Sequence, residues 1–243
     1  MAETRDRALV VDLDGTLYRG DGPVRAYAEL VAADLPAARA ADFLSIVDKY
    51  LTDGVSGVAE PELLAATDGW EAVARLATAR FGVGRAELDA AFLGSRRKLA
   101  EESCFVEVPG GFLDVLRTLR PSTRLVLATN SPALGLAELL ARLDANDIFD
   151  EVVSGARKPF GLPILLGGLA CRLGVLGRPW RLFSVGDHWH NDIEPAREFG
   201  AITGYIDRFG RADGPADVVS ATLEGVLPTI VEWSAGPDQF SPQ

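Results

Sequence analysis

Two carboxylates stand where the first apolar run of the chain stops. Asp12 and Asp14 are separated by one residue in the segment Asp-Leu-Asp-Gly-Thr-Leu, directly after the apolar residues 8–11. In doubly wound sheets, ligands bind beyond the carboxyl ends of the strands, so a strand over residues 9–13 places both acids where chemistry is expected. Taken alone, the pair is equally compatible with a turn or a helix cap.

Three more polar segments occur at the ends of apolar runs or at the start of a helical pattern. They are residues 129–131 (Thr-Asn-Ser), 157–159 (Arg-Lys-Pro) and 187–192 (Asp-His-Trp-His-Asn-Asp). Each by itself is ordinary, because turns, surface lysines and acidic loops are common. Because ligands bind beyond the carboxyl ends of the strands in doubly wound sheets, polar groups at these places are candidates for the same site as the first acidic pair.

Short apolar runs alternate with helical patterns along most of the chain, which predicts a parallel sheet with crossover helices. The expected strands are residues 9–13, 124–129, 151–154, 181–185 and 201–206, with 216–219 as a candidate sixth. The expected helices of this sheet are residues 111–119, 134–143, 162–173 and 193–199. The predicted fold class is therefore α/β, with a doubly wound parallel sheet.

The interval between the first two expected strands is too long for one crossover. About ninety residues separate Tyr18 from Pro109, and apolar positions recur there at helical spacing, as in residues 70–81 and 85–98. We therefore expect an inserted helical domain over residues 21–108. The core domain would comprise residues 1–20 and 109–233, and residues 234–243 would form a flexible tail.

The charge balance is acidic. The chain of 243 residues has 24 Lys and Arg against 35 Asp and Glu, a formal net charge of −11, which argues against binding to nucleic acid or an anionic membrane surface. The basic run at residues 96–98, late in an expected helix, is expected to face solvent. No secretory signal or membrane span is evident, and only two cysteines occur, far apart, so we expect a cytoplasmic protein without disulfides.

Residues 12–17 resemble the first motif of the haloacid dehalogenase superfamily, whose members are mostly phosphatases. The segments 129–131, 157–159 and 185–192 resemble the second, third and fourth motifs, in the same order. The resemblance implies a Rossmann-like core with a helical cap between the first two motifs, at about residues 21–108. Such a cap closes over the site, excludes water and selects the substrate.

The resemblance also implies roles for individual residues. Asp12 would attack phosphorus and form an aspartyl-phosphate, and Asp14 would act first as general acid and then as general base. Magnesium would be held by Asp12, the backbone carbonyl of Asp14, Asp187 and, directly or through water, Asp192. The phosphoryl oxygens would be bound by Gly15, Thr16, Thr129, Asn130 and Lys158. Thr16 would also orient Asp14 through its hydroxyl.

The predicted site has a surplus of negative charge. Lys158 and one divalent cation would neutralise only half of the charge that four carboxylates and a phosphate dianion bring together. The repulsion must therefore be offset in two further ways, by a protonated acid and by donors from backbone amides and hydroxyls.

Several alternatives stay open within this resemblance. Dehalogenase members lack an acid at the place of Asp14, because a halide leaves without a proton, so a phosphatase is favoured. A sugar-phosphate mutase keeps both acids, and a catalytically idle binding module on the same fold is a further alternative. His188 and His190 form an incomplete metal set and are expected to line the loop. The expected partner is a small phosphorylated metabolite. The sequence indicates neither the identity of this metabolite nor the oligomeric state.

Overall fold

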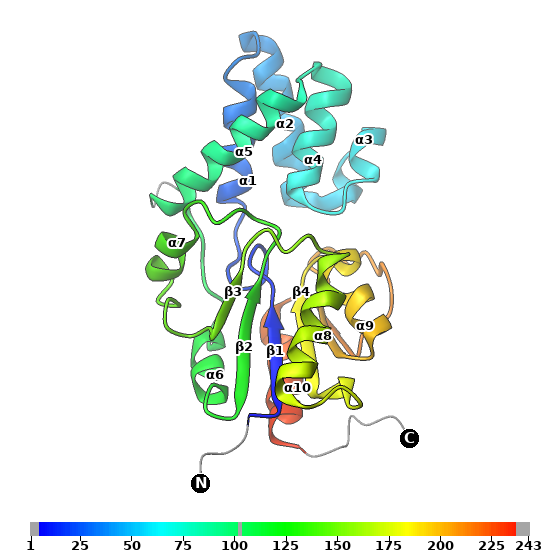
Figure 1. The fold of residues 1–243 in the computed structure, drawn as a ribbon. Coiled ribbons are helices and arrows are strands. Elements are labelled where there is room, and N and C mark those ends of the chain that lie inside the picture. Colours follow the sequence, from blue (N-terminus) through cyan, green and yellow to red (C-terminus); the bar gives the residue numbers. More distant parts are fainter. Residues whose placement is uncertain (1–4, 102–103, 237–243) are drawn as a thin grey trace. The chain divides into compact units, whose positions relative to one another are not determined.

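A six-stranded sheet forms the core of the first of two compact units of the chain (Figure 1). The computed structural model describes residues 5–101 and 104–236. The strands are β1 (Arg7–Val11), β2 (Thr123–Ala128), β3 (Glu151–Val153), β4 (Leu182–Gly186), β5 (Ile202–Ile206) and β6 (Val218–Ser220). All neighbours are parallel, in the order β3-β2-β1-β4-β5-β6. The predicted doubly wound α/β fold is confirmed, and each strand begins and ends within two residues of its predicted bounds.

The inner strands are buried on both faces. Every residue of β1, β4 and β5 is buried, and β2 has one half-buried residue, Arg124. Such strands are nearly continuous apolar runs, because helices cover both faces of a parallel sheet. The edge strands β3 and β6 have three residues each and expose Val152 and Val219. Short edge strands offer little backbone for pairing with another chain.

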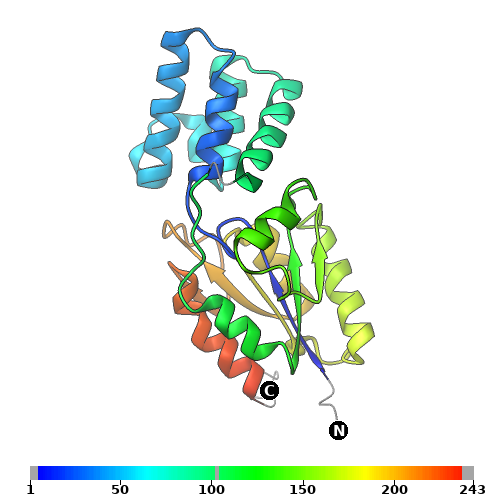
Figure 2. The ribbon, with the colours of Figure 1, turned by 90° about the vertical axis from the view of Figure 1, so that its left-hand side faces the viewer.

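Helices cover both faces of this sheet. They are α6 (Phe112–Leu119), α8 (Gly161–Leu173), α9 (Glu194–Phe199) and α10 (Leu223–Ala235). On one face, α8 and α9 pack against a cluster that includes Val10. On the other, α6 lies beside α10 (Figure 2). The ring of Trp233 on α10 is 5.3 Å from that of Phe183. Helix α10 is not among the predicted helices and takes in the start of the expected tail 234–243, of which residues 237–243 lie outside the described part of the chain.

A second compact unit consists of Gly20–Val106 and Leu134–Arg142, and the rest of the chain forms the first unit. The α-helices of the second unit are α1 (Gly22–Ala32), α2 (Ala37–Asp53), α3 (Pro61–Leu64), α4 (Gly69–Leu76), α5 (Arg85–Ala100) and α7 (Leu136–Arg142). Its core is rich in aromatic residues. The rings of Tyr27, Trp70 and Phe92 lie 5.4–6.0 Å apart in tilted and edge-to-face pairs, which is a favourable geometry.

Helix α7 belongs by its contacts to the second unit, although it connects two strands of the sheet. The guanidinium of Arg142 donates to the backbone carbonyls of Leu99 and Cys104, both at 2.6 Å. Carbonyl groups at the end of a helix such as α5 lack intrahelical partners, so the bond to Leu99 satisfies one of them. The division therefore differs at this helix from the expected core over 109–233, because periodicity predicts a helix but not the layer on which it packs.

The basic residues 96–98 at the end of α5 differ in their exposure to solvent. Arg97 is exposed as expected, but the prediction is wrong for Arg96, whose exposed fraction is 4%. Its guanidinium carbon lies 4.4 Å from the ring centroid of Trp70 and 5.1 Å from that of Phe92. Residues four apart share one face of a helix, which places Arg96 above Phe92 in the core, where the aromatic faces attract the cation.

Two further features concern the whole of the described chain. Within residues 5–101 and 104–236, the helices are all too short or too polar to cross a bilayer. Cys104 is buried and Cys171 is exposed, and no disulfide joins them.

The helix expected over residues 85–98 is confirmed as α5, whereas the helix expected over 70–81 is α-helical only to Leu76 and continues as a π-helical turn.

Candidate active site

The loop that follows β1 lies against the end of β4. The backbone N–H of Asp12 donates to the carbonyl of Val185 at 3.0 Å, so this acid keeps the register of the sheet. Gly15 has a φ of +82°, a backbone conformation that residues with a Cβ atom rarely adopt. A Cβ at Gly15 would lie 1.9 Å from Oδ2 of Asp187. A side chain at this position would therefore displace the carboxylate of Asp187 from the loop.

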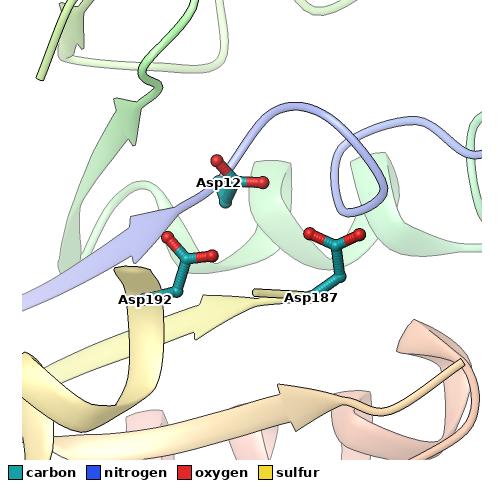
Figure 3. A group of neighbouring side chains, drawn as sticks. All are labelled: Asp12, Asp187 and Asp192. Atoms are coloured by element: carbon teal, nitrogen blue, oxygen red, sulfur yellow. The ribbon is translucent and has the colours of Figure 1, made fainter. Parts of the chain in front are cut away.

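Three carboxylates converge at this edge of the sheet (Figure 3). One oxygen each of Asp12, Asp187 and Asp192 lies within 4.8 Å of the other two. Asp12 follows β1, Asp187 follows β4, and Asp192 comes from the π-helical turn Trp189–Ile193. These strands are neighbours in the sheet, so their ends bring the acids together. An all-oxygen set of this kind fits Mg²⁺, which prefers carboxylate ligands.

Lys158 is a buried counter-charge for two of these acids. Its Nζ donates to Oδ1 of Asp12 at 2.6 Å and to Oδ1 of Asp192 at 2.5 Å. Burial by itself would lower the pKa of Lys158, but attraction to Asp12 and Asp192 outweighs it and raises the pKa above its ordinary value. The ammonium group thus carries a permanent positive charge at the centre of the acidic cluster.

The surroundings of Asp12 disfavour its ionised form. Burial, together with the charges of Asp192 and Asp14, raises its pKa from 3.8 to about 7, against the opposing effect of Lys158. In the absence of a cation, burial and the crowding of negative charge therefore favour the protonated form of Asp12. A divalent cation at the three carboxylates would favour the ionised form instead.

Asn130 and Thr129 shape the loop after β2. The amide of Asn130 accepts a hydrogen bond from the backbone N–H of Lys158 at 2.7 Å and donates to its carbonyl at 2.9 Å, so it fixes the lysine's backbone. The hydroxyl of Thr129, which is 1% exposed, accepts from the backbone N–H of Ser131 at 3.0 Å. Its own proton stays available as a donor. The contacts of both residues with phosphate remain predictions. At Asn130 the side-chain amide is bonded to Lys158, so the backbone is the group that would bind phosphate.

Asp14 has surroundings unlike those of the three converging acids. Its carboxylate accepts hydrogen bonds from the hydroxyl of Tyr18 and, at 2.8 Å, from the hydroxyl of Ser131. Neither partner was identified from the sequence. Ser131 stands in the segment that resembles the second motif, and Tyr18 follows Asp14 by four residues, but spacing alone does not indicate that both hydroxyls point toward one acid.

The predicted role of Thr16 in orienting Asp14 is wrong. Thr16 is 0% exposed, and within the described part of the chain its hydroxyl has no hydrogen-bond partner. The loop closes through backbone bonds, with the N–H of Leu17 donating to the carbonyls of Asp12 at 3.3 Å and Leu13 at 3.1 Å. This turn buries the Thr16 side chain, and the hydroxyls of Tyr18 and Ser131 reach Asp14 instead.

The two histidines lie in the loop that carries Asp187 and Asp192. The backbone N–H of His188 donates to Oδ2 of Asp192 at 3.2 Å, and the ring of the exposed His190 lies 3.1 Å from Oε2 of Glu194. The cluster of possible metal ligands found among the described residues contains acids alone, without a histidine. The loop also buries Trp189, a residue to which sequence reasoning assigned no role.

The sequence model of the haloacid dehalogenase-like hydrolases matches residues 7–200 of the chain. This stretch contains every residue of the acidic cluster, Lys158, and the loop that holds Asp14. It also contains the whole of the second compact unit. Among curated proteins, none matches the sequence.

Solved structures with a similar fold cover nearly the whole chain. A predicted phosphoglycolate phosphatase from Haemophilus somnus has a TM-score of 0.64 and 17% identity, over 92% of this chain and 97% of that one. The hydrolase YfnB from Bacillus subtilis, bound to magnesium, has a TM-score of 0.57 and 16% identity, over 92% and 98%. An L-2-haloacid dehalogenase has a TM-score of 0.56 and 20% identity, over 93% and 98%. At these identities the likeness concerns the fold.

Proposed function

The chain belongs to the haloacid dehalogenase-like hydrolases, and from this premise we propose that it is a magnesium-dependent phosphatase acting on a small phosphorylated metabolite. The observation that carries the proposal is the contrast between two acids at the end of β1. Asp12 is buried against Lys158, whereas Asp14 is held by two hydroxyls. Carboxyl groups in different surroundings can divide the roles of nucleophile and proton donor between them.

The chemistry proceeds in two displacements at phosphorus. In the first, an oxygen of Asp12 forms a bond to phosphorus while the bond to the leaving alcohol breaks, and Asp14 gives its proton to the leaving oxygen. In the second, a water oxygen forms a bond to phosphorus while the bond between phosphorus and Asp12 breaks, Asp14 takes a proton from this water, and inorganic phosphate leaves. Asp12 and Asp14 thereby return to their starting forms, so both steps balance without another reagent.

The remaining residues bind and orient the phosphoryl group. Lys158 already lies at hydrogen-bond distance from Asp12, so its ammonium group can reach an oxygen of a phosphoryl group bound there. The hydroxyl of Thr129 and the backbone N–H groups around Gly15 and Asn130 are the proposed further donors. A divalent cation held by Asp12, Asp187, Asp192 and the backbone carbonyl of Asp14 would neutralise charge on the phosphoryl oxygens.

A dehalogenase is the competing activity, since one solved structure of similar fold is an L-2-haloacid dehalogenase. Asp14 argues against it for this chain, because a departing halide needs no proton. The two activities are separated by measuring chloride release from a 2-chloroalkanoic acid beside phosphate release from phosphorylated substrates. Chloride release without phosphate release would refute the phosphatase proposal and identify a dehalogenase.

The direct test is phosphate release from a panel of phosphorylated metabolites, with Mg²⁺ and with a chelator. We expect release that depends on Mg²⁺, and its loss in Asp12→Asn, because an amide is a far weaker nucleophile than a carboxylate. Asp114→Asn is the matched control, since Asp114 lies on α6 with a side chain that is 85% exposed and forms an ion pair of 3.4 Å. Hydrolysis retained by Asp12→Asn would refute the proposal.

A further inference from the structure

The loop between Asp187 and Asp192 is docked on the segment that joins β5 to β6. Trp189, at the centre of this loop, is 9% exposed and packs with Ile193, Tyr205 and Ala216. Its indole Nε1 donates to the backbone carbonyl of Pro215 at 3.2 Å. Through this side chain, the loop that carries two of the three converging acids contacts a separate part of the sequence, the segment after β5.

The docking surface requires a glycine. A Cβ at Gly214 would lie 2.1 Å from Cζ2 of Trp189 and 2.3 Å from Cε2, so the indole rests directly on the backbone of Gly214. These are atoms of a rigid ring, which cannot bend away by itself. Any larger residue at this position must therefore displace the indole or the segment beneath it.

The segment beneath Trp189 is held firmly by its own hydrogen bonds. Asp207, at its start, accepts from the backbone N–H groups of Arg211 at 2.8 Å and Ala212 at 2.9 Å. Further along, the hydroxyl of Tyr205 donates to Oδ2 of Asp213 at 2.9 Å, and Nε of Arg211 donates to the same oxygen at 3.0 Å. The indole is therefore seated on an ordered surface rather than on a loop that could follow it.

The acidic loop needs such an anchor, because the like charges of its acids repel one another. Its far end is fixed by the hydroxyl of Ser184, which donates to the backbone carbonyl of Asp192 at 2.8 Å. Its near end continues β4. Trp189 ties the middle of the loop to the segment between β5 and β6, three residues before Asp192 and two after Asp187.

We propose that Trp189, seated on Gly214, is a positioning residue that holds Asp187 and Asp192 at the spacing needed to bind a divalent cation. This inference rests on the cation site of the proposed function. It assigns no chemical step to the indole, which acts through the two acids. Substitution of residues that orient metal ligands typically costs about 10–100-fold in metal affinity.

The test measures binding of Mn²⁺ alone, followed by electron paramagnetic resonance, with Mg²⁺ as competitor. We expect Trp189→Phe and Gly214→Ala each to weaken Mn²⁺ binding by about tenfold. Trp233→Phe is the matched control, because Trp233 also donates from its indole, to the carbonyl of Trp180 at 2.8 Å, but on α10. This control should lower the melting temperature and leave Mn²⁺ binding unchanged.

A double variant separates a positioning role from general damage. Phenylalanine lacks the outer ring atoms that meet Gly214, so Gly214→Ala should cause little further loss of Mn²⁺ affinity in the Trp189→Phe background. Wild-type affinity in both single variants, with a lowered melting temperature, would overturn the inference. If wild type and variants bind Mn²⁺ as expected but no phosphate is released from any substrate, the phosphatase proposal fails while the positioning role stands. Absence of Mn²⁺ binding by the wild type would overturn both.

Discussion

Two regions of the molecule bury a cationic side chain, and they do so with opposite partners. In the first unit, Lys158 donates to Asp12 and Asp192 at 2.6 and 2.5 Å. In the second, Arg96 lies over the rings of Trp70 and Phe92. Carboxylates can exchange the ammonium group for another cation or share it with a bound anion, whereas aromatic rings only accommodate the charge. The burial of a charge therefore does not identify a reactive site, and the nature of its partners does.

The strongest test of this contrast is the loss of each cation in turn, beginning with Lys158→Met. We expect kcat/KM for phosphate release to fall by about 10³-fold, because the donor to the phosphoryl group is lost and the buried acids lose their counter-charge. Lys158→Arg, which keeps the charge but not its compact geometry, should recover part of the loss. A Lys158→Met enzyme with more than a tenth of wild-type activity would contradict the assignment.

The next effect concerns the hydroxyl that holds Asp14. Ser131→Ala removes the hydrogen bond of 2.8 Å to this acid, and we expect kcat to fall by about tenfold with little change in KM, because proton transfer rather than binding is impaired. Ser122→Ala is a suitable control, since Ser122 donates to a backbone carbonyl of α6 and contacts no acid of the site. Equal kinetics for the two variants would show that Ser131 does not act on Asp14.

A smaller effect is expected in the pH dependence of stability without metal. The pKa of Asp12 is raised from 3.8 to about 7 in the folded state, so between these values the folded chain keeps a proton that the unfolded chain has lost. The contribution of Asp12 is therefore complete below about pH 3.8 and is lost as the pH rises toward 7. In the presence of a chelator, the melting temperature of the wild type should fall more steeply across this range than that of Asp12→Asn. Added Mg²⁺ should reduce the difference, and parallel curves in the chelator would contradict the shift.

The smallest effect on activity should come from Arg96→Met in the second unit. The loss of the cation above Trp70 and Phe92 is expected to cost about 1–2 kcal/mol of stability, seen as a melting temperature lower by about 2–4 °C for each kcal/mol. The kcat of the folded enzyme should change less than threefold. A fall in kcat comparable to that of Lys158→Met would erase the distinction between the two buried cations.

The outline of the site could be read from the order of residue types along the chain. Asp12, Lys158 and Asp187 each follow a strand or open a helix, and parallel strands end at one edge of a sheet, so their convergence follows from the topology. The helical character of the inserted segment was equally clear from its periodicity. These inferences depend on local patterns and on one rule of sheet geometry, which is why they could be made without coordinates.

Other features depended on the packing of side chains from distant segments. The hydroxyls that reach Asp14 come from Tyr18 and Ser131 rather than from Thr16, because the turn after β1 buries the threonine. Helix α7 packs with α5 although the chain order places it between two strands. The fit of Trp189 onto Gly214 joins residues of separate loops. Sequence patterns indicate which residues share a face of one element, but the direction of each side chain and its partner are decided only when the elements pack together.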